Sequence, residues 1–168
     1  MQLFIITLAL IIIINIILQS TVLPYLSIFG FVPNTALIIV VSISLLRGKY
    51  YGGFFGLFVG LIQDIIFGSV IGVNSFIYFI IGYIIGSIQN TIDIENKIIP
   101  PICSAVSTIF YNLTYFLFMF FLSRNIPISV MLKNVFSLEI LYNSILSIFI
   151  YKLFSKFFVV PSLKFGRR

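Results

Sequence analysis

A ladder of glycines that leads to one acid constrains this chain more than any other feature. Inside the apolar run GGFFGLFVGLIQDIIFGSVIG, every fourth residue is small or acidic: Gly52, Gly56, Gly60, Asp64 and Gly68. Glycine costs about 1 kcal/mol against alanine in a helix exposed to water, so a repeated ladder indicates close backbone contact with a neighbouring helix. An acid at the centre of a membrane-length segment costs roughly 2.5–3.5 kcal/mol on insertion scales. We therefore expect another helix to pack directly against this segment.

The composition is that of an integral membrane protein. Of the 168 residues, 61% are hydrophobic and 8% are charged, and the mean hydropathy is +1.22. A soluble domain carries about 25% charged residues. One membrane span needs about 20 apolar residues, so six spans and short loops fill a chain of this length and leave no room for a soluble domain. We expect an all-α, six-transmembrane-helix bundle that forms a single transmembrane domain over residues 1–168.

Six apolar segments are separated by short connections. The expected spans cover residues 3–23, 31–46, 50–69, 74–88, 98–122 and 135–154. The second span is short, and Pro33 suits the first turn of its helix because a missing N–H needs no partner there. The glycines expected at helix contacts are Gly52, Gly56, Gly60, Gly68, Gly72, Gly82 and Gly86.

The basic residues predict an orientation. If the connection with Arg47 and Lys49 is cytoplasmic, Lys97 and the five basic residues that follow residue 150 lie on the same side. Only Arg124 and Lys133 then lie outside, and the reverse orientation would contradict the positive-inside rule. We expect a multi-pass membrane protein with cytoplasmic N- and C-termini. Topology and contact with lipid headgroups account for the net charge of +6, so no nucleic-acid partner is expected.

Asp64 has two interpretations at this point. In the expected orientation it lies about 21 Å from Tyr50, beyond the midplane of a core about 30 Å thick. It is either a buried carboxyl group that fixes neighbouring helices or a ligand for an ion, a proton or a substrate. It is the only acid within a span that lacks a nearby basic residue. A proton relay or coupled transport usually needs more than one acidic group, so the structural interpretation is favoured. The candidate hydrogen-bond donors are Gln63, Asn74, Ser75, Tyr78 and Asn112.

The sequence offers little for catalysis. It contains no histidine and no paired carboxylates within the spans, so general acid–base chemistry lacks its usual residues. Cys103 and the serines have no visible activating base, and Cys103 lacks partners for a disulfide or a metal site. No metal-ligand spacing and no phosphate-binding glycine loop is present in the sequence. We expect no enzymatic activity, no cofactor and no metal site.

The spacing of these residues resembles that of the rod shape-determining protein MreD family. The resemblance begins at Phe31-x-Pro33-Asn34 and continues, after an apolar span, with the glycine ladder. It then includes Gln63-Asp64, followed by Gly68-Ser69 and Gly72-Val73. Its specific part covers about residues 31–86, and the length, the basic tail and the six-span layout are similar over the rest. Asn34 is no departure, because the family varies between Asn and Asp after the proline.

The resemblance implies a bacterial cell-membrane protein without catalytic activity. It implies a scaffold or regulator of the elongation machinery, which builds lateral peptidoglycan and maintains rod cell shape. The partner it implies most directly is an MreC-like bitopic protein. MreB, the glycosyltransferase RodA and a class B penicillin-binding protein would be reached through the complex, and membrane lipid surrounds the bundle.

A distant similarity of the family implies an alternative function. The family resembles the six-helix substrate-binding subunits of energy-coupling-factor transporters, which suggests a similar helix arrangement. The alternative is a vitamin-type, small-molecule binding subunit of a membrane transporter. In that case Asp64, Asn74 and Tyr78 would converge on a polar cavity near the outer face.

Overall fold

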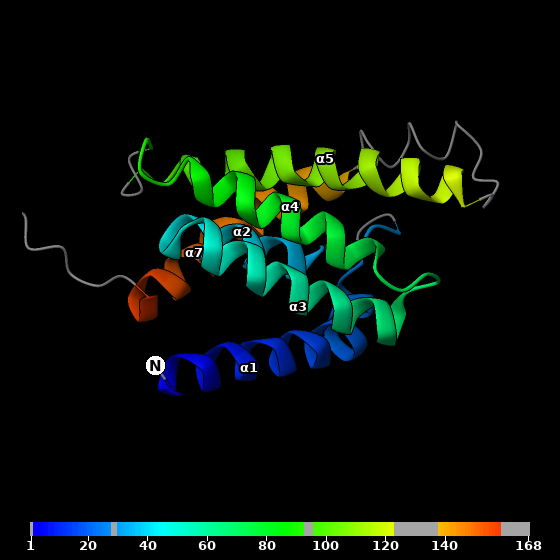
Figure 1. Ribbon diagram of the computed structural model, residues 1–168, viewed down its shortest axis with the longest axis horizontal. Helices are drawn as coiled ribbons and strands as arrows, with labels where there is room; N and C mark the ends of the chain where they lie inside the picture. The colour runs from blue at the N-terminus through cyan, green and yellow to red at the C-terminus, as the bar shows by residue number, and fades with distance from the viewer. Residues whose placement is uncertain (1, 28–29, 93–95, 123–137, 159–168) are drawn as a thin grey trace, which may run out of the picture.

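The computed structural model describes residues 2–27, 30–92, 96–122 and 138–158 (Figure 1). Within these residues the chain forms six α-helices, as the composition predicts for an all-α protein. They are α1 (Gln2–Ile17), α2 (Thr35–Arg47), α3 (Lys49–Phe67), α4 (Val73–Ser87), α5 (Ile99–Phe121) and α7 (Leu138–Phe158). A π-helical turn (Leu18–Val22) and a 3-10 turn (Leu23–Leu26) follow α1.

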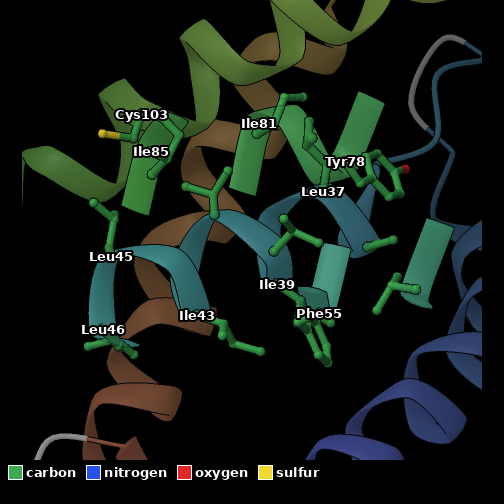
Figure 2. Close-up of a cluster of buried hydrophobic side chains, with 14 of the residues drawn as sticks. Leu37, Ile39, Ile43, Leu45, Leu46, Phe55, Tyr78, Ile81, Ile85 and Cys103 are labelled. Atoms are coloured by element: carbon green, nitrogen blue, oxygen red, sulfur yellow. The ribbon is translucent and has the colours of Figure 1, made fainter. Parts of the chain in front are cut away.

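The short helix α2 lies at the centre of the bundle. Every residue from Thr35 to Leu46 is buried, and α2 contacts α3, α4, α5 and α7. Apolar side chains cover all sides of α2, which is typical of a helix enclosed by other helices. Figure 2 shows its side chains beside labelled side chains of α3, α4 and α5. The labelled members of this cluster are Leu37, Ile39, Ile43, Leu45, Leu46, Phe55, Tyr78, Ile81, Ile85 and Cys103.

Within the described residues, four helical segments are long and apolar enough to cross a membrane. They are Ile6–Tyr25, α3, α5 and α7. α2 has 13 residues and α4 has 15, which gives about 20 Å and about 22 Å at 1.5 Å per residue. Both are shorter than a hydrocarbon core of about 30 Å. Because α2 is enclosed by other helices, its ends do not need to reach the lipid surface.

The second expected segment, residues 31–46, is α-helical only from Thr35. Asn34 is the N-cap of α2, because its side-chain oxygen accepts a hydrogen bond from the backbone N–H of Leu37 at 3.1 Å. Pro33 therefore precedes the cap and does not occupy the first turn, which corrects the position expected from the sequence. Its ring is fully buried in the bundle.

The other helices begin and end near the expected limits, with two differences. The segment expected over residues 3–23 is α-helical only to Ile17, and a π-helical turn follows it. In that turn the hydroxyls of Ser20 and Thr21 donate to the backbone carbonyls of Ile16 and Ile17, one turn earlier. α7 extends to Phe158, four residues beyond the expected end, because Phe154 and Phe158 both pack into the core. The remaining predictions concern positions outside the described residues: 135–137, Arg124, Lys133, Lys164, Arg167 and Arg168.

Candidate functional site

α3 and α4 form an antiparallel hairpin with the most extensive contact of any helix pair in the described part of the chain. A Cβ at Gly56 would overlap a backbone carbonyl of α4, and a Cβ at Gly60 would lie 2.5 Å from the Cα of Ser75. A Cβ at Gly82 of α4 would overlap the carbonyl oxygen of Gly52. Since real Cβ atoms do not come this close to backbone atoms, the two helix backbones can touch at these points because one of them carries glycine there.

The same contact continues to the other end of the hairpin. A Cβ at Gly86 would lie 2.5 Å from the carbonyl carbon of Gly48, at the start of α3. Gly52 also faces α2, because a Cβ there would overlap the hydroxyl of Ser44. The contacts therefore repeat about once per helical turn, and successive contacts advance along α3 while they go back along α4. α2 packs against the same glycine face of α3 at Gly52.

Asp64 lies near the end of α3 and binds the start of α4. Its Oδ2 accepts hydrogen bonds from the backbone N–H groups of Gly72 at 2.9 Å and Ser75 at 3.1 Å. Its Oδ1 accepts from the backbone N–H of Asn74 at 3.2 Å and from Nδ2 of the same residue at 2.8 Å. The first N–H groups of a helix have no partner inside the helix, and an acidic group is favourable beside them. Asp64, which is 1% exposed, thus caps α4 from the preceding helix.

Two glycines shape the turn that brings Asp64 to α4. Gly68 ends α3, and a Cβ there would lie 2.5 Å from the backbone oxygen of Asp64. Gly72 has φ +101°, a left-handed conformation that other residues rarely adopt, although a Cβ at this position would meet no atom within 4 Å among the described residues. Space therefore requires glycine at 68, and backbone conformation favours it at 72. The spacing of one acid and two glycines encodes a capped turn.

Asn34 belongs to a second set of polar contacts that crosses the bundle. Its Oδ1 accepts from the hydroxyl of Tyr78 at 2.9 Å, in addition to the cap bond with α2. Its backbone N–H donates to Oδ1 of Asn143 at 2.9 Å. Nδ2 of Asn143 then donates to the hydroxyl of Thr108 at 3.1 Å. All four of these residues are buried, and they join α2, α4, α5 and α7.

The two sets of contacts meet at a pair of tyrosines. The hydroxyl of Tyr111 donates to Oδ1 of Asn74 at 2.6 Å, and its ring centroid lies 5.5 Å from that of Tyr78. Asn74 binds Asp64, and Tyr78 binds Asn34. The structure thus brings Pro33-Asn34, Asp64 and three of the expected donors, Asn74, Ser75 and Tyr78, into one region of the bundle.

The four hydrogen bonds to Asp64 come from residues other than Asn112 and Gln63, the two remaining donors named from the sequence. Nδ2 of Asn112 donates to Oε2 of Glu139 at 3.4 Å, a contact between α5 and α7. Oε1 of Gln63 is buried and has no hydrogen-bond partner within the described residues. The cap on α4 is therefore built without either side chain.

The arrangement of these groups suits the fixing of helices. Burying a polar group is unfavourable unless it is hydrogen-bonded, and a carboxyl group deprived of water needs several donors. Asp64 receives four hydrogen bonds, all from α4 and the residue before it. Its capacity as an acceptor is largely used inside the protein, which leaves little of it for a bound ligand.

Sequence reasoning does not single out Asn143, Thr108 and Tyr111. Asn143 contacts Asn34, which lies 109 positions earlier, so no local pattern reveals the pairing. A usable signal is the presence of an amide inside an otherwise apolar helix, since such groups commonly hydrogen-bond across helices in membranes. Asn15 of α1 follows the same rule, because its Oδ1 accepts from the hydroxyl of Thr35 at 2.7 Å.

Comparison with known proteins adds a family to this geometry. A family model described as rod shape-determining protein MreD matches residues 1–158. No curated protein and no solved structure matches the chain. The matched range includes the whole of the polar cluster, from Asn34 to Asn143, and the complete α3–α4 hairpin.

Proposed function

The chain belongs to the rod shape-determining protein MreD family, and from this premise we propose that it is a non-catalytic membrane scaffold of the bacterial elongation complex. The family acts in rod shape determination and is associated with the MreB/MreC system. Within that role we place the protein in lateral peptidoglycan synthesis. We propose an MreC-like bitopic protein as its direct partner, with MreB, RodA and a class B penicillin-binding protein joined through the complex.

The bonding of Asp64 is the observation that carries the scaffold proposal. Among the buried polar groups, this carboxyl group is the one best suited to bind a cation or a substrate. Four donors of the α3–α4 hairpin occupy it instead. The carboxyl group of Asp64 therefore holds α3 and α4 in a fixed relation. This favours the proposal of a scaffold, which presents a rigid surface to its partners.

We also propose six spans with both termini in the cytoplasm. The four long apolar segments support a membrane location. The shorter helices α2 and α4 would cross the membrane packed against these longer segments. Arg47, Lys49 and Lys97 lie at one end of the bundle, which would be the cytoplasmic end. Reporter fusions test this: alkaline phosphatase fused after residue 127 should be active, and a fusion after residue 168 should be inactive. The reverse pattern would exclude this orientation.

A complementation experiment tests the scaffold function. Gly60→Leu inserts a bulky side chain where α3 touches the backbone of α4, whereas Phe58→Leu changes an exposed side chain of the same helix. In a rod-shaped host depleted of its own family member, the first variant should give round cells and recover less of the MreC-like partner. The second should give rods and normal recovery. Normal shape and full recovery with Gly60→Leu would contradict the proposal.

The alternative, a small-molecule binding subunit, receives less support from the geometry. It needs Asp64, Asn74 and Tyr78 to offer polar atoms to a ligand. Asp64 and Asn74 bind each other, and the hydroxyl of Tyr78 donates to Asn34. Mass spectrometry of the protein purified from membranes decides between the two, because a tightly bound vitamin-like molecule would favour the alternative.

A further inference from the structure

One end of the bundle carries every basic side chain that the structure describes. These residues are Arg47, Lys49, Lys97, Lys152 and Lys156. They lie where α2 and α7 end and where α3 and α5 begin, at the left of Figure 1. Asp64 and Glu139, the two acidic residues within the described ranges, lie toward the opposite end. Asp93 and Glu95, in the connection before α5, are outside those ranges.

Lys49 is held between two exposed tyrosines. Its Nζ lies 5.3 Å from the ring centroid of Tyr50 and 5.7 Å from that of Tyr83. These are cation–π distances, and the rings are 65% and 41% exposed. Tyrosine is enriched at the level of the lipid headgroups, where its ring meets apolar chains and its hydroxyl meets water. The geometry therefore directs this ammonium group toward the headgroup layer.

A second pair of lysines lies on α7. Lys152 and Lys156 are one helical turn apart, so they share a face, and both are exposed. Phe149, Leu153 and Phe157 are exposed around them. A long basic side chain among apolar neighbours extends its methylene groups along them and carries its charge to the membrane surface. This face of α7 thus carries apolar side chains suited to acyl chains and positive charge at the same depth in the membrane.

We propose that Lys49, Lys152 and Lys156 bind the phosphate groups of anionic phospholipids in the adjacent leaflet. Basic residues at a membrane surface attract anionic lipid, and the apolar and aromatic side chains beside these three are suited to the acyl chains and the glycerol region. An acidic segment of a water-soluble protein would not match the exposed Phe149, Leu153 and Phe157. The inference goes beyond the scaffold function and does not depend on it.

Spin-label electron paramagnetic resonance on the full chain tests the proposal. The protein is reconstituted in phosphatidylcholine vesicles with a trace of spin-labelled phosphatidylglycerol or spin-labelled phosphatidylcholine, and the motionally restricted fraction of each is compared. The natural chain should prefer phosphatidylglycerol. Replacing all three lysines (Lys49→Gln, Lys152→Gln and Lys156→Gln) should reduce that preference by about fivefold or more.

A charge-conserving variant is the matched control. Lys49→Arg with Lys152→Arg and Lys156→Arg should keep the preference, and added salt should weaken it in the natural chain. Full retention of the preference by the glutamine variant overturns the proposal, and so does its equal loss in the arginine variant. If the glutamine variant keeps its lipid preference but loses an acidic protein in co-purification, the surface serves a protein and the proposal is also wrong. The vesicles contain no partner protein, so failure here leaves the scaffold proposal intact.

Discussion

α1 and the α3–α4 hairpin are both apolar, yet they contact the rest of the protein in opposite ways. The segment Ile6–Tyr25 is the most hydropathic of the four long ones, but most of its large side chains are exposed. α3 is less hydropathic and buries a face rich in glycine against α4. Hydrophobicity indicates which segments enter a membrane, because lipid is as apolar as a neighbouring helix. Small and polar residues indicate which segments touch.

The kind of contact differs as well as its extent. In the hairpin, backbone lies against backbone, and Asp64 adds four hydrogen bonds at one end. α1 meets the core through a few partly buried side chains, including Leu8, Ile11 and Ile12. Its polar link to α2 is the hydrogen bond between Asn15 and Thr35. The hairpin should therefore respond sharply to single changes, and α1 should respond weakly.

The largest expected effect comes from adding one methyl group to the hairpin. In Gly82→Ala the new Cβ would lie 2.5 Å from the carbonyl carbon of Gly52 and 2.9 Å from the backbone nitrogen of Gly53, so the helices must separate. We expect a loss of about 3 kcal/mol in the free energy of unfolding, at the upper end of typical overpacking. Unfolding by sodium dodecyl sulfate in mixed micelles measures it.

Gly53→Ala is the matched control, because it adds the same methyl group to a buried glycine of the same hairpin. The nearest atom to that Cβ would be Cε2 of Phe79 at 3.4 Å, which is ordinary contact. Since alanine is the better helix former by about 1 kcal/mol, this variant should be neutral or more stable. Equal effects of the two substitutions would show that the hairpin is not held by backbone contact.

The next effect concerns the cap. Asp64→Asn keeps one side-chain oxygen but replaces the other with an NH₂ group, which cannot accept from the backbone N–H groups it would face. Two donors lose their acceptor, at about 1–3 kcal/mol each when fully buried. Because the N–H of Gly72 is only partly buried, we expect a loss near the lower end of that sum, roughly 2–3 kcal/mol, and a lower Tm in detergent. Gln63→Met should cost less than Asp64→Asn, because it leaves all four hydrogen bonds to Asp64 in place and removes an amide oxygen that has no hydrogen-bond partner within the described residues. Similar losses for both variants would remove the cap as an explanation.

The hairpin can be predicted closely from the sequence because its determinants are local. The segments expected over 50–69 and 74–88 correspond to α3 (Lys49–Phe67) and α4 (Val73–Ser87). Glycine in a helix, glycine at a turn and an acid before a helix start each act over a few residues. Asn74 and Ser75, two donors suggested for Asp64, indeed lie beside it. The roles assigned to these residues stay predictions until variants test them.

The features that the sequence does not reveal depend mostly on distant segments. α2 begins at Thr35, four residues later than expected, because Asn34, the residue after the proline, serves as its N-cap. Asn143 contacts Asn34 from the last described helix, and only the folded arrangement brings the two together. The complete burial of α2 likewise follows from four surrounding helices. An apolar run looks the same whether lipid or protein covers it.

The smallest expected effect is on α1, and it tests whether one hydrogen bond fixes this helix. Asn15→Leu removes the acceptor of the Thr35 hydroxyl, and Thr35→Val removes the donor. Hydrogen bonds between membrane helices average about 0.6 kcal/mol in double-mutant cycles, so we expect a coupling of that size and a single-variant loss below about 1 kcal/mol. A coupling above about 2 kcal/mol would mean that α1 is bound to α2 as tightly as the hairpin helices are bound to each other. Burial alone would then be a poor guide to attachment in this bundle, and α1 would belong to its rigid part.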